Sequence, residues 1–260
     1  MPSKISRLIL KKKNKSKIVC LTAYSKNTAE EIDKYTDLVL VGDSLGSVLY
    51  NFDTTRKVNL NMMIKHSKSV RKGVKKSLMI VDMPFNTYRN KSQALKNCKK
   101  VLKETKCDGI KLEGGRKIIP IVKNLTKNKI PVMGHVGILP QTDKKFSFKG
   151  KKQKEITRIL NDTKLLENAG AFSIVLECVE TKLSKQITKN IKIPTIGIGS
   201  SSNCDGQVLV IDDLIGMSDS KFKFVKKYVD LSRIINSAVK KYKNEVKNKQ
   251  FPKAKHSFAN

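Results

Sequence analysis

The chain contains eight short runs of apolar residues, many of them β-branched, spaced along its first 211 residues. Most of these runs are continuous rather than alternating, which is typical of parallel strands that are covered on both faces. The pattern therefore predicts strands at Lys17–Ala23, Leu38–Val41, Leu78–Val81, Gly109–Leu112, Pro131–Gly134, Phe172–Leu176, Thr195–Ile198 and Val208–Ile211.

Amphipathic segments with helix signals separate the apolar runs. Thr28 and Ser92 are candidate N-caps, because their hydroxyls can accept hydrogen bonds from the free N–H groups of a first helical turn. Pro120 suits a first turn, and Gly170 suits the left-handed residue that follows a helix. A further amphipathic helix is expected over Leu231–Lys247.

Eight strands alternating with helices over about 210 residues predict a (β/α)8 barrel, a TIM barrel. The alternative is a doubly wound open sheet, which would normally carry a Gly-rich phosphate loop after its first strand, and none follows Ala23. We expect a single domain over residues 1–260, with a short N-terminal extension, a flexible loop over Gln141–Lys154 and an irregular tail from Lys249.

The charge of the chain adds a second candidate class. The formal net charge is +32, which ordinarily points to nucleic acid or to an anionic membrane. However, only seven of the 54 basic residues are arginine, the side chain with the bidentate fork that phosphate and base recognition favours, and the lysines are spread along the chain. We therefore favour a solvated lysine surface with no specific nucleic-acid partner, while a Lys-rich nucleic-acid-binding protein stays an alternative.

Two further observations concern location. No apolar run approaches the roughly 20 residues that a bilayer-spanning helix needs, and the basic N-terminal segment lacks the apolar core of a signal peptide. The five cysteines are scattered without CxxC spacing, so a disulfide framework or a structural zinc site is disfavoured. These features predict a cytoplasmic protein with reduced thiols and no membrane partner.

The candidate chemistry lies where the predicted strands end, because catalytic groups of such barrels hang from the C-terminal ends of the strands. Asp43, Asp82 and Glu113 follow three successive strands and should converge at one rim. Packed carboxylates repel one another, and a hard divalent cation such as Mg²⁺ relieves that repulsion while leaving room for a chelating substrate. The pattern thus predicts a magnesium site.

Three more side chains at the same rim are candidate catalytic residues. Lys111 lies two residues before Glu113, so both side chains point the same way and Lys111 can stabilise a developing oxyanion. Glu177 ends an apolar strand and is a usable general base. His135 follows the fifth strand between Gly134 and Gly137, and its alternative role is that of a hydrogen-bonded structural histidine.

Nine short motifs then occur in a specific order. They are Thr-Ala-Tyr at 22–24, Val-Gly-Asp-Ser-Leu-Gly at 41–46, Val-Asp-Met-Pro-Phe at 81–85, Ile-Lys-Leu-Glu-Gly-Gly at 110–115, Gly-His-Val-Gly-Ile-Leu-Pro-Gln at 134–141, Leu-Glu-Cys-Val at 176–179, Ile-Gly-Ile-Gly at 196–199, Cys-Asp-Gly-Gln-Val-Leu-Val at 204–210 and His-Ser-Phe at 256–258. With these motifs the chain resembles the ketopantoate hydroxymethyltransferase family over nearly its whole length.

The resemblance implies a barrel of the phosphoenolpyruvate/pyruvate type that uses Mg²⁺. It implies transfer of a one-carbon unit from 5,10-methylenetetrahydrofolate to 3-methyl-2-oxobutanoate, which gives 2-dehydropantoate for pantothenate and coenzyme A synthesis. It also implies a homo-oligomer, commonly a decamer. Carried over by motif, the metal residues are Asp43, Asp82 and Glu113, the substrate-binding residues are Asp43, Ser44, Asp82 and Lys111, and the proton acceptor is Glu177.

Three departures from the family pattern concern the folate side of the site more than the metal chemistry. They are Ser25 after Thr-Ala-Tyr, Ser47 after Gly-Asp-Ser-Leu-Gly, and the sequence of residues 146–150 in the loop after the fifth strand. The alternatives left open are another Mg²⁺-dependent lyase or mutase acting on a 2-oxo acid, and an inactive barrel retained as a subunit.

Overall fold

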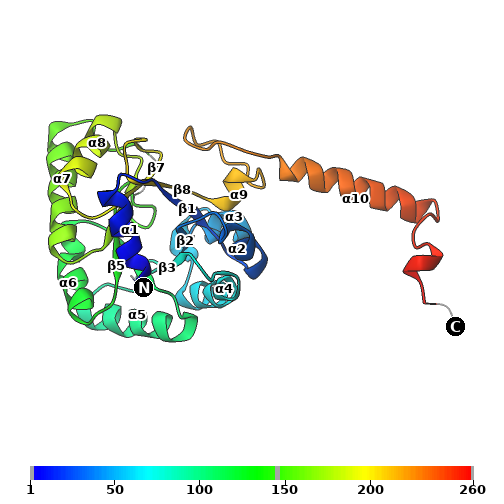
Figure 1. Cartoon of the computed structure of the whole chain (residues 1–260), viewed down its shortest axis with the longest axis horizontal. Helices are drawn as coiled ribbons and strands as arrows, with labels where there is room; N and C mark the ends of the chain where they lie inside the picture. The colour runs from blue at the N-terminus through cyan, green and yellow to red at the C-terminus, as the bar shows by residue number, and fades with distance from the viewer. Residues whose placement is uncertain (1–2, 144–146, 259–260) are drawn as a thin grey trace. The chain divides into compact units, whose positions relative to one another are not determined.

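Eight parallel strands close into a barrel in this computed structural model, which describes residues 3–143 and 147–258 (Figure 1). Each strand pairs with its sequence neighbours, and β8 pairs with β1. This closure confirms the predicted (β/α)8 barrel and excludes the open sheet. The strands are β1 (Ile18–Thr22), β2 (Leu38–Val41), β3 (Leu78–Asp82), β4 (Gly109–Glu113), β5 (Val132–Gly137), β6 (Ser173–Glu177), β7 (Thr195–Ile198) and β8 (Gly206–Leu209).

Helices follow most strands, and those between the strands cover the outside of the barrel (Figure 1). The helices of the described chain are α1 (Lys4–Lys13), α2 (Lys26–Ile32), α3 (Leu45–Tyr50), α4 (Leu60–Gly73), α5 (Lys91–Thr105), α6 (Ile119–Lys127), α7 (Gln153–Asn168), α8 (Thr181–Asn190), α9 (Ile211–Leu214) and α10 (Leu231–Lys247), with short 3₁₀ helices η1 (Thr55–Lys57), η2 (Arg116–Ile118) and η3 (Ala254–His256). In the described part of the chain, no helix has the length and apolar character needed to cross a bilayer.

The chain forms two compact units, Met1–Val210 and Ile211–Asn260. The barrel occupies the first unit, and the single domain over residues 1–260 stays a prediction. The second unit contains α10, whose bounds match the predicted helix, and none of its residues is buried. The tail expected to be irregular includes η3, and residues 144–146 of the expected flexible loop lie outside the described residues.

The helix starts differ from two of the predicted caps. Ser25, not Thr28, caps α2, and its hydroxyl accepts a hydrogen bond from the Thr28 N–H. Asn90, not Ser92, caps α5 in the same way. Both helices start earlier than predicted because an upstream polar residue in extended conformation already satisfies the first turn. Gly170 follows α7 with a φ of +91°, as expected.

The N-terminal helix lies across the N-terminal end of the barrel. Leu8 of α1 is buried in the apolar cluster that also contains Ile18, Leu38 and Leu78. Its lysines reach carboxylates that each directly precede a strand: Lys11 pairs with Asp37, Lys4 with Asp108 and Lys12 with Asp205. Each of these aspartates also accepts a hydrogen bond from the backbone N–H of a neighbouring strand, from Val19, Met79 and Thr195 respectively. The helix thus closes the end of the barrel opposite the strands' carboxyl ends.

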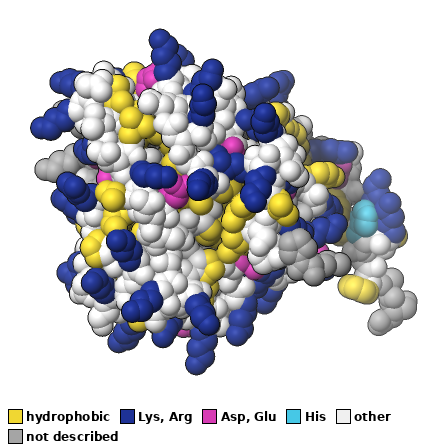
Figure 2. Space-filling model, turned by 60° about the vertical axis from the view of Figure 1, so that its left-hand side comes forward, with side chains coloured by type: hydrophobic (Ala, Val, Ile, Leu, Met, Phe, Trp, Pro, Cys, Tyr) yellow, Lys and Arg dark blue, Asp and Glu magenta, His cyan; other side chains and the backbone are white. Residues whose placement is uncertain are grey.

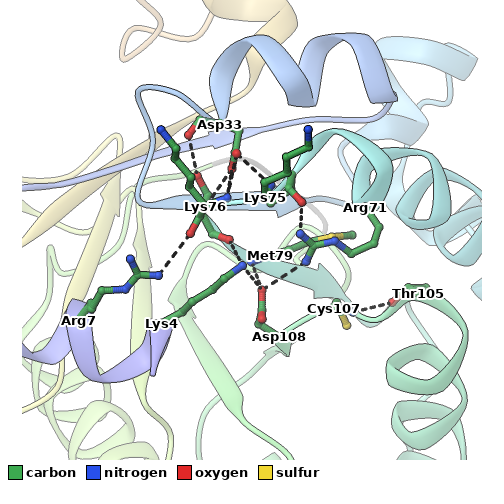
Figure 3. A network of polar contacts seen from close by, with 12 residues as sticks. Lys4, Arg7, Asp33, Arg71, Lys75, Lys76, Met79, Thr105, Cys107 and Asp108 are labelled. Carbon is green, nitrogen blue, oxygen red and sulfur yellow. Dashed lines mark hydrogen bonds and ion pairs between the residues drawn. The ribbon is translucent and has the colours of Figure 1, made fainter. Parts of the chain in front are cut away.

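A second part of this network fixes the loop before β3 (Figure 3). The buried Asp33 carboxylate accepts hydrogen bonds from the backbone N–H groups of Lys75, Lys76 and Ser77. Burial alone would raise the pKa of Asp33, but these three donors outweigh it and lower the pKa below its ordinary value. The ionised Asp33 carboxylate therefore fixes the conformation of the loop through these hydrogen bonds.

The lysine excess is distributed over the surface. Figure 2 shows Lys and Arg side chains spread over the visible face, with few Asp or Glu among them and no single basic stripe. Nucleic-acid binding usually needs basic residues clustered in a patch or stripe, and the face in Figure 2 shows none. The solvated lysine surface stays a prediction.

Candidate active site

The strand register gathers the candidate residues at the carboxyl end of the barrel. Asp82 lies opposite Lys111, Glu113 lies opposite His135, and Gly137 lies opposite Glu177 on neighbouring strands. The side chains of the first four are buried, with 6% exposure or less. The last residues of β3, β4 and β6 are therefore the charged ones, which extends these strands one residue beyond their predicted apolar runs.

Asp43, Asp82 and Glu113 form what we call the carboxylate cluster. The Asp43 N–H donates a hydrogen bond to Asp82 Oδ2 at 3.1 Å, and Lys111 Nζ lies 2.9 Å from Asp82 Oδ1. Gln141 connects the other two members, because its amide contacts Asp43 and its backbone N–H donates to Glu113 Oε2. The three carboxylates thus lie close together in one buried site at the carboxyl ends of the strands. Their positions after three successive strands predicted this convergence.

The electrostatics of the cluster follow from burial and mutual repulsion. Burial raises the pKa of Asp43 well above its ordinary value, and the charges of Asp82 and Glu113 raise it further. Burial also raises the pKa of Asp82, although Lys111 opposes this. Burial would lower the pKa of Lys111, but Asp82, Glu113 and Asp43 outweigh it and raise that pKa. The site therefore favours a cation, and Lys111 supplies one.

His135 lies between two carboxylates from neighbouring strands. Its Nδ1 is 3.5 Å from Glu113 Oε1, and its Nε2 is 3.2 Å from Glu177 Oε2. Burial and the nearby Lys111 disfavour the imidazolium, but Glu113 and Glu177 outweigh them and raise the pKa of His135 to about 9. Burial would raise the pKa of Glu113, but His135 and Lys111 lower it. His135 thus couples the cluster to Glu177.

Glu177 is the most accessible of these groups, with its side chain 18% exposed. Gly137 makes this placement feasible: its φ is +104°, and a Cβ there would lie 2.1 Å from the Glu177 carbonyl oxygen. The backbones of β5 and β6 therefore approach closely where His135 meets Glu177. The close neighbour at Gly137 is thus backbone.

Ser44 is held by residues that the sequence did not assign to the site. Its hydroxyl lies 2.8 Å from the Tyr24 hydroxyl, and the Tyr24 carbonyl oxygen lies 2.7 Å from His66 Nδ1. The second ring nitrogen of His66 contacts the Tyr50 hydroxyl at 2.9 Å. His66 therefore forms polar contacts beside a candidate substrate-binding residue.

Gln141 and Tyr88 are the main residues that sequence reasoning missed. Gln141 was placed at the start of the flexible loop, yet it is 1% exposed and touches two of the three carboxylates. Its amide oxygen accepts a hydrogen bond from the Tyr88 hydroxyl at 2.5 Å. The Pro-Gln end of the motif at 134–141 was the available signal, but the polar lysine-rich stretch after it indicated only a loop.

The donor set suits a hard divalent cation. The carboxylate cluster offers oxygen ligands only, and Asp82 Oδ1 is buried with the Lys111 ammonium as its only polar neighbour among the described residues. In residues 3–143 and 147–258, no group of three His, Cys, Asp or Glu side chains converges enough to hold an ion unaided. Asp82 is turned to Lys111 and Glu113 to His135, so the expected three-ligand metal site is not preformed. Oxygens from substrate or water would have to complete the coordination.

Solved structures with the same fold are named as enzymes of other reactions. A phosphonopyruvate hydrolase in complex with oxalate and Mg²⁺ matches with a TM-score of 0.61 and 11% identity, covering 98% of this chain and 93% of that one. A 2,3-dimethylmalate lyase, described as a PEP mutase/isocitrate lyase superfamily member, matches with a TM-score of 0.60 and 12% identity, covering 100% and 93%. At such identities the likeness shows the fold alone, which is the expected (β/α)8 barrel.

Sequence relatives are far closer. The 3-methyl-2-oxobutanoate hydroxymethyltransferase of Pelagibacter ubique (strain HTCC1062) is 64% identical over 249 residues, which are 96% of this chain and 97% of the relative. The enzyme of the same name from Bartonella tribocorum is 44% identical over 257 residues, covering 97% and 95%. The family model described as ketopantoate hydroxymethyltransferase matches residues 3–254. The chain therefore belongs to the ketopantoate hydroxymethyltransferase family of enzymes.

Proposed function

We propose that this enzyme transfers a one-carbon unit from 5,10-methylenetetrahydrofolate to 3-methyl-2-oxobutanoate and so forms 2-dehydropantoate for pantothenate and coenzyme A synthesis. The observation that carries the proposal is the line from Glu177 through His135 to Glu113 and Lys111 in one buried site. In this line a partly exposed carboxylate, which could act as a base, lies beside residues suited to hold a charged 2-oxo acid. Family membership supports the choice of reaction.

The substrate carries a carboxylate and a neighbouring keto oxygen, and both would meet this cluster. Asp43 and Asp82, with Glu113 beside them, would hold Mg²⁺ together with these substrate oxygens. The bound cation would polarise the keto group and offset negative charge as the C3 proton leaves. Ser44, at the start of α3, and Lys111 would contact the substrate directly.

The chain's own residues would carry out the proton transfer. Glu177 would remove the C3 proton, and the electron pair of the broken C–H bond would move toward the keto oxygen. Lys111, kept charged by its three carboxylate neighbours, would stabilise the negative charge that develops there. His135, held between Glu113 and Glu177, would orient the Glu177 carboxylate. His135 would also share the proton that Glu177 takes from the substrate.

Carbon transfer would then follow between the two substrates. As the electron pair at C3 attacks the methylene carbon of the folate and forms a C–C bond, one of the two C–N bonds of that carbon would break, and its electron pair would go to the nitrogen, which takes up the proton removed from C3. Water would then cleave the second C–N bond: its hydroxyl would go to the carbon, giving the hydroxymethyl group of 2-dehydropantoate, and its proton to the nitrogen, giving tetrahydrofolate. The balance needs no oxidant or reductant.

The test is direct assay of 2-dehydropantoate formation with and without methylenetetrahydrofolate, and with and without a chelator. We expect product only when the folate donor and a divalent cation are both present. Folate-independent consumption of a 2-oxo acid would instead indicate a lyase or mutase, and absence of turnover would indicate an inactive barrel.

Assembly and partners stay part of the proposal. We propose a homo-oligomer, a decamer by family resemblance, located in the cytoplasm and without a specific nucleic-acid partner. Light scattering tests the subunit number. A gel shift repeated at rising salt tests the last point, because binding through phosphates alone weakens steeply with ionic strength.

A further inference from the structure

Gln141 makes four hydrogen bonds in the site although the proposed mechanism does not use it. Its Nε2 donates to Asp43 Oδ2 at 2.8 Å and to the Met83 carbonyl oxygen at 3.0 Å. Its Oε1 accepts from the Tyr88 hydroxyl, and its backbone N–H donates to Glu113 Oε2 at 3.1 Å. At 1% exposure, every polar atom that this side chain has is therefore committed to a protein partner.

The orientation of the carboxamide is determined by its partners. The NH₂ group carries two protons, and two pure acceptors, a carboxylate and a carbonyl, face it. In the reversed orientation, Oε1 would face both acceptors at hydrogen-bond distance, which is repulsive in a site that excludes water. The Tyr88 hydroxyl adds a donor on the opposite side. Only one amide orientation thus satisfies all partners.

This connection reaches three strands of the barrel. Asp43 follows β2, Met83 follows β3 directly after Asp82, and Glu113 ends β4. One side-chain hydrogen bond and the backbone N–H of Gln141 both go to carboxylates of the cluster, so these contacts fix the directions of carboxylate oxygens.

We infer that Gln141 is a positioning residue whose amide holds Asp43 in the orientation needed for a divalent cation, and that Tyr88 acts through Gln141 by fixing its amide. The effect of this inference on catalysis rests on the proposed function. Its geometric part, that Gln141 orients a carboxylate of the cluster, is independent of the proposed function. Residues that orient metal ligands typically change metal affinity 10- to 100-fold when removed.

The test starts with Gln141→Met, which keeps the length of the side chain and removes both amide groups. Mn²⁺ alone serves as the probe, and its dissociation constant is measured by electron paramagnetic resonance on the full chain. We expect affinity to fall about tenfold or more. Turnover at low metal should fall in parallel and return to within about threefold of wild type at saturating metal. A residue that only supported the fold would give no such rescue.

A matched control guards against general loss of structure. Gln207 lies on β8 and donates its amide to the Ser201 carbonyl oxygen at 2.9 Å, away from any carboxylate of the cluster. Gln207→Met should leave Mn²⁺ affinity unchanged. Circular dichroism at the assay temperature confirms that both variants are folded. If Gln141→Met does not fold, Gln141→Asn, which is too short to reach Asp43, replaces it with the same expected loss.

Tyr88→Phe tests the second half of the inference. It removes only the hydroxyl, so Mn²⁺ affinity should fall less than in Gln141→Met. In the double variant the loss should equal that of Gln141→Met alone, because Tyr88 acts through the amide. Additive losses would overturn the role assigned to Tyr88.

The outcomes separate this inference from the proposed function. If wild type binds Mn²⁺ but lacks folate-dependent turnover, the function fails, while a weaker Gln141→Met complex still supports the inference. If wild type turns over and Gln141→Met binds Mn²⁺ with wild-type affinity, the inference is overturned and the function stands.

Discussion

Lys111 Nζ lies 2.9 Å from Asp82 Oδ1, with both side chains almost fully buried at the carboxyl end of the barrel. The two residues face each other across β3 and β4. Asp43 and Glu113 also act on Lys111, because their charges raise its pKa. One ammonium therefore balances several carboxylates, and the stability of the metal-free site depends on it.

Lys111→Met should destabilise the metal-free enzyme by about 3–5 kcal/mol at pH 7, because it leaves Asp82 buried without a counter-charge. The pKa of Asp82 is already raised by burial, and losing Lys111 raises it further. A carboxyl with a raised folded-state pKa binds its proton more tightly in the folded protein. The variant should therefore regain stability as the pH falls, which urea unfolding in chelator at several pH values measures.

The double variant Lys111→Met/Asp82→Asn is the control for this prediction. It removes the unpaired charge together with its partner and should recover most of the lost stability. Equal stability of wild type and Lys111→Met at pH 7 would contradict the pairing, as would a double variant no more stable than the single one.

Much of the fold was predictable because most of the barrel strands are largely apolar and are buried on both faces. The match is poorest at β8, which begins at Gly206 rather than Val208, because the exposed Gln207 near its start is not apolar. Helix caps were less predictable, since several polar residues near Ser25 and Asn90 could serve and only backbone conformation decides among them.

The site was predictable as far as strand ends determine it. Side chains that end neighbouring strands, such as Asp82 and Glu113, must converge once the barrel closes. Gln141 belongs to a loop, and nothing local in its sequence shows that the loop folds back over the carboxylates. The pairing of Lys111 with Asp82 rather than Glu113 likewise depends on strand register, which residue spacing within one strand does not reveal.

The charge of His135 should make the stability of the metal-free enzyme depend on pH. Its folded-state pKa of about 9 lies above its ordinary value of 6.5, so the imidazolium is favoured by folding. The stabilisation is fully present below pH 6.5 and is lost as the pH rises through about 9. From the linkage of pKa to stability, its size is on the order of 3 kcal/mol.

Urea unfolding of wild type and His135→Asn in chelator, from pH 6 to pH 10, measures this contribution. The wild-type unfolding free energy should fall more steeply over this range than that of the variant. Parallel curves would show that Glu113 and Glu177 do not hold the imidazolium in the folded protein.

Glu177→Gln should abolish proton removal while preserving binding. Loss of a general base typically lowers the rate 10²- to 10⁴-fold, so exchange of the substrate's C3 proton with deuterium should fall by that factor. Mn²⁺ affinity should stay near wild type because Glu177 lies outside the carboxylate cluster. Nuclear magnetic resonance follows the exchange without the folate donor.

Glu180→Gln is the matched control, because Glu180 lies three residues further on and its carboxylate caps α8 through the Leu183 N–H. It should exchange the C3 proton at the wild-type rate. Exchange in Glu177→Gln as fast as in this control would remove Glu177 from the proposed role.

The opposite end of the barrel should affect stability but not catalysis. Lys12 of α1 donates to Asp205 Oδ2 at 2.7 Å and to the Thr188 carbonyl oxygen at 2.9 Å, and its pair with Asp205 is only 13–14% exposed. Lys12→Met should therefore cost about 1.5–3 kcal/mol, the usual range for hydrogen bonds to charged groups. Lys34 pairs with Glu31 on the open surface, where such pairs contribute little, so Lys34→Met should leave the urea midpoint unchanged. Because catalytic groups of this fold lie at the carboxyl ends of the strands, kcat of folded Lys12→Met should equal that of wild type. A lowered kcat with an unchanged urea midpoint would show that α1 acts on the chemistry rather than on the fold.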